Sequence, residues 1–264
     1  MGYFTRFKNK NKAPKKFSEE QLEELKTQPR WIRGSIKYQD HDFFYHDAQC
    51  FYDSYQEIIY DEIYRFKTTH VEPVIIDCGA NMGVSVMFFA KEYPQARIIA
   101  FEPEEEIFAV LQKNKESYNF SNVILHKNAV WDSETTLEFF TDHGMGGSVE
   151  NTFKRQKPAI VKTVRLADYL QTPVALLKLD IEGAEYTVLK DCEPYLHNVE
   201  NIFVEYHSFE KKEQHLEEIL SMFKKNGFRY HLRQSFSRKR PMVDKNNICE
   251  NMDMAINVFA YREI

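Results

Sequence analysis

The chain has 264 residues, 43% of them hydrophobic, which suits one α/β domain with an attached segment better than two full domains. A formal net charge of −5 at pH 7, with a pI near 6.0, gives no reason to expect nucleic acid as a partner. No apolar stretch is long enough to span a bilayer, no secretory signal is recognisable, and the four cysteines lack paired spacing. We therefore expect a cytoplasmic protein with reduced thiols.

Residues 1–16 carry six basic side chains and no acidic ones, interleaved with Phe4 and Phe7. Terminal charge runs of this kind are usually disordered, so we expect a solvated tail. The alternative is an arm that makes weak contact with an anionic surface.

Residues 17–70 form an aromatic-rich segment that we expect to be helical. The spacing of Phe51, Tyr55, Ile58, Ile59 and Ile63 fits a helix that lays one apolar stripe on the rest of the domain. An aromatic stripe at helical spacing is usually core, although a rim of tyrosines could also stack on sugar rings.

In residues 71–264, apolar strand-like runs alternate with helix-like periods. The predicted strands are Val74–Asp77, Arg97–Phe101, Val123–Asn128, Ala175–Asp180, Ile202–Tyr206, Arg229–Leu232 and Ala255–Tyr261. The predicted helices are Val84–Tyr93, Glu104–Tyr118, Glu185–Leu196 and Lys211–Asn226. This alternation predicts a mainly parallel sheet with helices on both faces.

Residues 132–165 interrupt the alternation with two short strand-like runs around a glycine-rich loop at 142–148. The loop is either a lid over a substrate or a plain hairpin connection.

The turn after the first predicted strand of the sheet reads D-C-G-A-N-M-G, from Asp77 to Gly83. Gly79 and Gly83 allow backbone and ligand to approach at the carboxyl end of a parallel strand, where open α/β sheets bind ligands. Dinucleotide folds place G-x-G-x-x-G here to hold a pyrophosphate, which the carboxylate of Asp77 would repel. The same carboxylate favours a ligand with an ammonium group, such as S-adenosylmethionine.

Further acidic residues follow later strands. Glu102 lies 19 residues after Gly83, where a carboxylate accepts ribose hydroxyls in both methyltransferases and NAD-binding proteins. Asp180 with Glu182, and Glu205 with His207, are two residues apart and can converge on one cleft. Ordinary salt bridges are the simpler explanation of these acidic residues. Burying isolated acidic side chains at the ends of apolar strands is energetically costly, however, unless they have a partner or a function.

These stretches resemble the motifs of the FkbM family of S-adenosylmethionine-dependent methyltransferases. The first motif, D-x-G-A-N-x-G-x-x-S, is matched from Asp77 to Gly83, with Ser85 shifted by one position. The others are F-E-P-E at 101–104, N-A-x-x-D at 128–132, K-x-D-x-E-G-A-E at 178–185 and E-x-H at 205–207. The resemblance covers roughly residues 47–228.

The resemblance implies a Rossmann-like class I methyltransferase fold with a seven-stranded, mostly parallel sheet and an antiparallel last strand. It implies S-adenosylmethionine as cofactor and a hydroxyl of a sugar, a glycan or a related small molecule as acceptor. The expected cofactor-binding residues are Asp77, Gly79, Ala80, Asn81, Gly83, Glu102, Asn128, Ala129 and Asp180. The expected catalytic residues are His207, Asp180, Glu205 and Glu182.

Removal of the acceptor's proton needs a base or a metal, and the unperturbed pKa of His207 suits a base near neutrality. We expect Glu205 or Asp180 to orient His207. The alternative is a divalent ion held by Asp180, Glu182 and His207, which the spacing does not require.

Two other functions stay open at this point. An NAD-dependent sugar-modifying oxidoreductase would share Glu102 but lacks its G-x-G-x-x-G turn, and a catalytically silent assembly module would not need the acids and His207. Acceptor identity and the oligomeric state, a homodimer included, cannot be read from the sequence.

Overall fold

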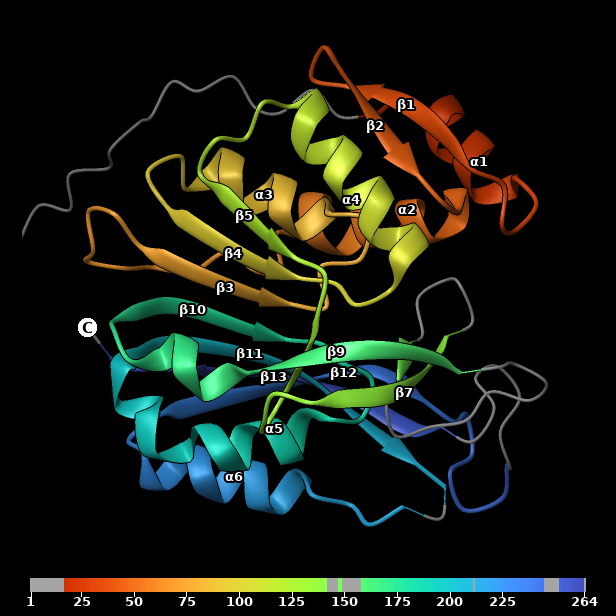
Figure 1. Cartoon of the computed structure of the whole chain (residues 1–264). Helices are drawn as coiled ribbons and strands as arrows, with labels where there is room; N and C mark the ends of the chain where they lie inside the picture. The colour runs from red at the N-terminus through yellow and green to blue at the C-terminus, as the bar shows by residue number, and fades with distance from the viewer. Residues whose placement is uncertain (1–16, 142–146, 149–157, 211, 245–251, 264) are drawn as a thin grey trace, which may run out of the picture.

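The computed structural model describes residues 17–141, 147–148, 158–210, 212–244 and 252–263. Its centre is a seven-stranded sheet with the strand order β12-β13-β11-β10-β3-β4-β5 (Figure 1). The strands are β3 (Val74–Cys78), β4 (Arg97–Phe101), β5 (Val123–His126), β10 (Val174–Leu179), β11 (Val199–Phe209), β12 (Arg229–Ser237) and β13 (Met252–Tyr261).

Neighbouring strands from β11 to β5 pair in parallel, whereas β13 pairs antiparallel with both β11 and β12. β13 therefore inserts between β11 and β12. The predicted α/β Rossmann-like fold, with a mostly parallel sheet of seven strands and an antiparallel last strand, is confirmed.

Two hydrophobic cores lie on the two faces of this sheet. Ile75 and Ile76 are both fully buried but belong to different cores, because successive strand residues point to opposite faces. On one face lie α3 (Val84–Glu92), α4 (Glu105–Ser117) and the N-terminal segment; on the other lie α5 (Glu185–Cys192) and α6 (Leu216–Lys225) (Figure 1). The short 3-10 helix η2 (Leu166–Leu170) precedes β10 in the sequence, and a second one, η3 (Glu193–Asn198), directly follows α5.

The N-terminal segment packs its aromatic side chains into the first of these cores. Its elements are α1 (Glu19–Thr27), β1 (Gly34–Tyr38), β2 (His41–Tyr45), α2 (Ala48–Ser54) and the π-helix η1 (Tyr55–Tyr60). Phe51, Tyr55 and Ile58 are buried, with Phe17 and Tyr38 packed against Tyr55. The core interpretation of this stripe is confirmed for these side chains.

The helical prediction for residues 17–70 omits the antiparallel hairpin of β1 and β2. Tyr38 pairs with His41, which leaves Gln39 and Asp40 as a two-residue turn. Both have positive φ, 52° and 69°, as a turn that matches the twist of a hairpin requires. The usual sequence signal for such a turn is Asn-Gly or Asp-Gly. Because neither dipeptide occurs at this turn, the sequence pattern did not indicate the hairpin.

A smaller sheet, ordered β6-β9-β7-β8, extends from the end of β5. Its strands are β6 (Ala129–Trp131), β7 (Thr136–Thr141), β8 (Gly147–Ser148) and β9 (Ala159–Arg165). β7 and β9 are the two strands predicted on either side of the glycine-rich loop, and they pair antiparallel. The lid interpretation and the N-terminal tail fall largely on residues 142–146 and 1–16, outside the described part of the chain.

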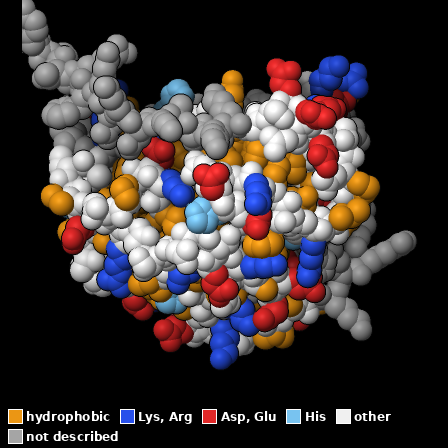
Figure 2. Space-filling view, turned by 90° about the horizontal axis from the view of Figure 1, so that it is seen from above, with side chains coloured by type: hydrophobic (Ala, Val, Ile, Leu, Met, Phe, Trp, Pro, Cys, Tyr) orange, Lys and Arg blue, Asp and Glu red, His pale blue; other side chains and the backbone are white. Residues whose placement is uncertain are grey.

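The face over the N-terminal segment and α4 carries acidic and basic side chains close to one another (Figure 2). Among the residues that the structure describes, no helix combines the length and the apolar character needed to cross a membrane.

Candidate functional site

The carboxyl ends of four neighbouring parallel strands, β4, β3, β10 and β11, meet at one edge of the sheet. The predicted site residues follow these ends in order: Glu102 after β4, the 79–83 turn after β3, and Asp180 after β10, with Glu205 and His207 on β11. The topology therefore gathers four of the five stretches singled out in the sequence, as expected for an open α/β sheet.

The turn between β3 and α3 has the tight geometry that its glycines predict. Gly79 and Gly83 have φ of 83° and 92°, in the left-handed region. A side chain at Gly79 would overlap the backbone oxygen of Asp180, and one at Gly83 would come within 2.6 Å of Leu111 Cδ1. The N–H groups of Gly79 and Ala80 both donate to the carbonyl oxygen of Phe101, which ties the turn to the end of β4.

Asp77, on β3 directly before this turn, makes contacts that hold the turn in place. It is fully buried, its Oδ1 lies 3.1 Å from Lys178 Nζ, and its Oδ2 accepts a hydrogen bond from Ser85 Oγ at 2.6 Å. The ammonium group next to Asp77 is thus that of Lys178, which also donates to the carbonyl oxygen of Gly79 at 2.6 Å. The chain therefore supplies the cation beside Asp77 itself.

Glu102 is held by the backbone on both of its oxygens. Oε2 accepts from the N–H of Asn81 at 3.0 Å, and Oε1 accepts from the N–H of Glu104 at 2.9 Å. Burial raises the pKa of Glu102 to about 7, and the two backbone donors offset part of that effect. A carboxylate has about four lone-pair positions, so Glu102 keeps acceptor capacity for a ligand.

Asn128 and Ala129 lie at the far end of this edge, beyond β5. The predicted strand to Asn128 ends at His126, whose ring stacks on Phe101 at 5.0 Å between centroids. Asn128 makes one long contact, from Nδ2 to the carbonyl oxygen of Lys162 at 3.4 Å, and Ala129 is buried at the start of β6.

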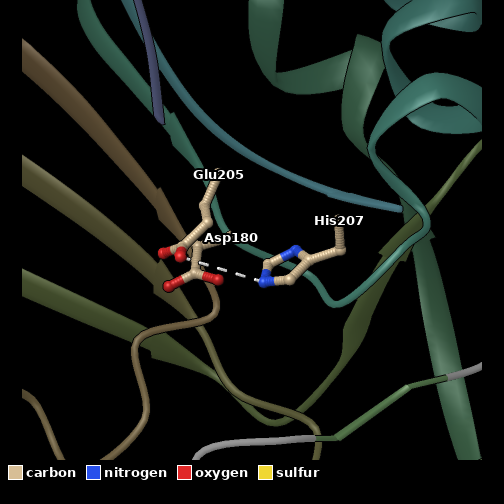
Figure 3. A group of neighbouring side chains, drawn as sticks. All are labelled: Asp180, Glu205 and His207. Carbon is tan, nitrogen blue, oxygen red and sulfur yellow. Dashed lines mark ion pairs between the residues drawn. The ribbon is translucent and has the colours of Figure 1, made fainter. Parts of the chain in front are cut away.

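At the other end of the edge, Asp180 and Glu205 turn their carboxylates toward the imidazole of His207 (Figure 3). Nε2 of His207 lies 4.0 Å from Glu205 Oε1 and 3.5 Å from Glu182 Oε2. Asp180 keeps 27% of its side chain exposed and lies 3.6 Å from Lys178 Nζ. The four predicted catalytic residues are therefore brought together.

Glu185, rather than Glu205 or Asp180, orients the imidazole. Its Oε1 lies 3.0 Å from His207 Nδ1, and it also accepts the N–H of Gly183 at 2.9 Å. Glu185 stands in the quoted motif at 178–185 and opens α5, and its place in that motif was the signal that could have identified it.

The carboxylates around the imidazole change the pKa of His207. Burial alone would lower its pKa, but Glu182, Glu185 and Glu205 outweigh burial and raise the pKa well above the ordinary value. Burial also raises the pKa of Glu182 to about 8 and that of Glu205 to about 7. The expectation of an unperturbed imidazole is wrong, because four acidic side chains stand around this one ring.

Asp180, Glu205 and His207 place one ligand atom each within 4.8 Å of one another, which a divalent cation could use. A second such group, Glu213, His215 and Glu218, lies nearer the surface. A cavity of about 210 Å³ borders His207 and Glu185, and aromatic side chains of Tyr186, Tyr206, Phe209 and His215 line it.

Comparison with known proteins gives a consistent result. A family model described as "Methyltransferase FkbM domain" matches residues 77–230, more than half of the chain. "Methyltransferase 1" of Beauveria bassiana is 28% identical over 181 residues, which cover 57% of this chain and 71% of the relative. "2-O-methyltransferase NoeI" of Sinorhizobium fredii is 25% identical over 156 residues, covering 51% of this chain and 63% of the relative.

Among solved structures, the methyltransferase FkbM from Methylobacillus flagellatus KT superposes with a TM-score of 0.49 at 14% identity. The match covers 80% of this chain and 54% of that protein, so this chain spans about half of its length.

Proposed function

Because the chain belongs to the FkbM methyltransferase family, we propose that it transfers a methyl group from S-adenosylmethionine to a hydroxyl group of a sugar, a glycan or a related small molecule. The observation that carries the proposal is the shared sheet edge, where a glycine turn and Glu102 adjoin an acidic cluster around a buried histidine. The name of the relative from Sinorhizobium fredii, a 2-O-methyltransferase, supports an oxygen acceptor.

The residues that follow β3, β4, β5 and β10 fit this cofactor. The unused lone pairs of Glu102 suit ribose hydroxyls, and the amide oxygen of Asn128 suits the amino group of an adenine. Asp77 is occupied by Lys178, so the partly exposed Asp180 is better placed for the ammonium group. Bound S-adenosylmethionine supplies the electrophilic methyl group.

The acceptor's hydroxyl group must lose its proton as its oxygen forms the new bond to carbon. We assign this proton to Nε2 of His207, since Glu185 holds Nδ1 and turns Nε2 toward Asp180 and Glu205. The raised pKa of His207 makes it a strong base once its own proton has left, and the neighbouring carboxylates stabilise the imidazolium that forms.

The test is to incubate the protein with S-adenosylmethionine labelled in its methyl group and a panel of methyl glycosides. We expect label in a methyl ether, identified by NMR from the shift of its methyl carbon, together with an equal amount of S-adenosylhomocysteine. Label on a carbon or nitrogen atom of the acceptor would contradict the assignment to a hydroxyl group.

A further inference from the structure

A row of polar side chains crosses three strands beside His207. Glu205 on β11 pairs with Asn257 on β13, and Asn257 pairs with Arg233 on β12. Register partners place their side chains on the same face of a sheet. The register of β12 shifts between Gln234 and Phe236, and within this irregularity Ser235 donates its hydroxyl to Glu205 at 2.7 Å.

The π-helix η1 of the N-terminal segment covers this row. Glu57 Oε1 accepts a hydrogen bond from Asn257 Nδ2 at 3.2 Å, and Asp61 lies 3.6 Å from Arg233. Burial raises the pKa of Glu57, and the negative charge of Asp180 raises it further. π-helical turns occur frequently at functional sites.

The amide oxygen of Asn257 lacks a hydrogen-bond partner among the described residues, although the residue is only 1% exposed. Turning the amide over would not help, because it would set two oxygens of Asn257 and Glu57 against each other. A buried acceptor without a donor is costly, and such groups in native structures call for a partner. The row therefore contains more hydrogen-bond acceptors than hydrogen-bond donors.

We propose that Glu57, Asn257 and Glu205 form a subsite for ring hydroxyls of the acceptor, next to the hydroxyl that is methylated. This inference rests on the proposed methyl transfer and specifies its acceptor as a sugar ring with neighbouring hydroxyl groups. A phenol or an isolated alcohol lacks the donors that the row needs. Glu205 joins the subsite to the reaction centre, because its Oε1 lies 4.0 Å from Nε2 of His207.

The experiment compares the best methyl glycoside of the panel with its deoxy derivative, which lacks one hydroxyl next to the methylated position. For the wild-type protein, we expect the loss of that hydroxyl to raise KM by roughly 10- to 100-fold, the value of a hydrogen bond to a charged group. Glu57→Gln and Asn257→Ala should each raise KM for the intact sugar, and in these variants the deoxy penalty should shrink to less than about threefold.

Glu62→Gln serves as the matched control, because Glu62 lies just after η1 but pairs with Arg65 on the surface. Its KM should equal that of the wild-type protein. Glu57 is only partly buried, so Glu57→Gln tests the subsite even if Asn257→Ala fails to fold.

The affinity of the protein for S-adenosylhomocysteine, measured by calorimetry, distinguishes failure of the subsite from failure of the proposed methyl transfer. Unchanged KM and an unchanged deoxy penalty in Glu57→Gln would overturn the subsite. So would a wild-type protein that binds S-adenosylhomocysteine and methylates a phenol but no glycoside. A wild-type protein that does not bind S-adenosylhomocysteine would instead overturn the proposed methyl transfer.

Discussion

The two halves of the sheet edge differ in how their charged groups are satisfied. At the ends of β3 and β4, Asp77 and Glu102 each make two contacts of 2.6–3.1 Å, with Lys178, Ser85 and backbone N–H groups. At the ends of β10 and β11, His207 has one contact of this length, with Glu185, and its distances to Glu182 and Glu205 are 3.5 and 4.0 Å.

We expect this difference to separate cofactor binding from chemistry. The first half is preorganised, with its backbone fixed before any ligand arrives, as a cofactor cradle needs to be. In the second half, Nε2 of His207 keeps distances of 3.5 and 4.0 Å to its neighbouring carboxylates, so a reacting group can still gain contacts there. Substitutions in the first half should therefore cost stability or cofactor affinity, and substitutions in the second half should cost turnover.

The largest expected effect is in the second half. His207→Ala removes the proposed base, and we expect kcat to fall by about 10² to 10⁴-fold while cofactor affinity stays at the wild-type level. The wild-type rate should also rise with pH above neutrality, since the raised pKa keeps His207 protonated at lower pH. Steady-state kinetics over pH 6–10 measure both effects, with His197→Ala, at an exposed position, as the control. A normal rate in His207→Ala would assign the proton to another group.

Lys178→Met should have the next largest effect, on stability. It leaves the buried Asp77 without its cation, which typically costs about 3–5 kcal/mol of unfolding free energy. Urea unfolding measures the loss. The double variant Lys178→Met with Asp77→Asn should recover part of it, because neither partner is then a buried unpaired charge. If Lys178→Met were as stable as the wild-type protein, the expectation that substitutions in the first half of the sheet edge cost stability would be contradicted.

Glu102→Gln should weaken the binding of S-adenosylmethionine while leaving unfolding free energy less affected. The ribose hydroxyls lose a charged acceptor, which corresponds to roughly 10- to 100-fold in affinity. Isothermal titration calorimetry gives the value, and Glu106→Gln, at an exposed position early in α4, is the control. Equal affinities for both variants would place the ribose elsewhere.

The smallest effect is a pH dependence of cofactor binding. The pKa of Glu102 is raised to about 7, so its ionised, accepting form is a minority at pH 6 and predominates at pH 8. Affinity for S-adenosylmethionine should rise across this range, by at most roughly tenfold. This dependence of affinity on pH should be absent in Glu102→Gln. If the dependence persists unchanged in that variant, another residue causes it.

Local patterns in the sequence were sufficient to predict the sheet and the residues at its edge. Short β-branched runs such as Val74–Cys78 are buried on both faces, and the carboxyl ends of parallel strands meet by topology alone. Asp180, Glu205 and His207 could be grouped for that reason.

Contacts between distant parts of the chain could not be predicted in this way. The pairing of Asp77 with Lys178 and of Glu57 with Asn257 joins positions 101 and 200 residues apart, and no periodicity encodes either. The pKa of His207 depends on which carboxylates surround it, so it follows only from the folded arrangement. The hairpin turn at Gln39 and Asp40 lacks the usual turn residues.

Calorimetric titration of the wild-type protein with S-adenosylhomocysteine and, separately, with NAD distinguishes a methyltransferase from an NAD-dependent enzyme. We predict one S-adenosylhomocysteine per chain and no heat of binding from NAD, because Glu102 adjoins a turn without the glycine pattern that holds a pyrophosphate. Binding of NAD without binding of S-adenosylhomocysteine would contradict the account.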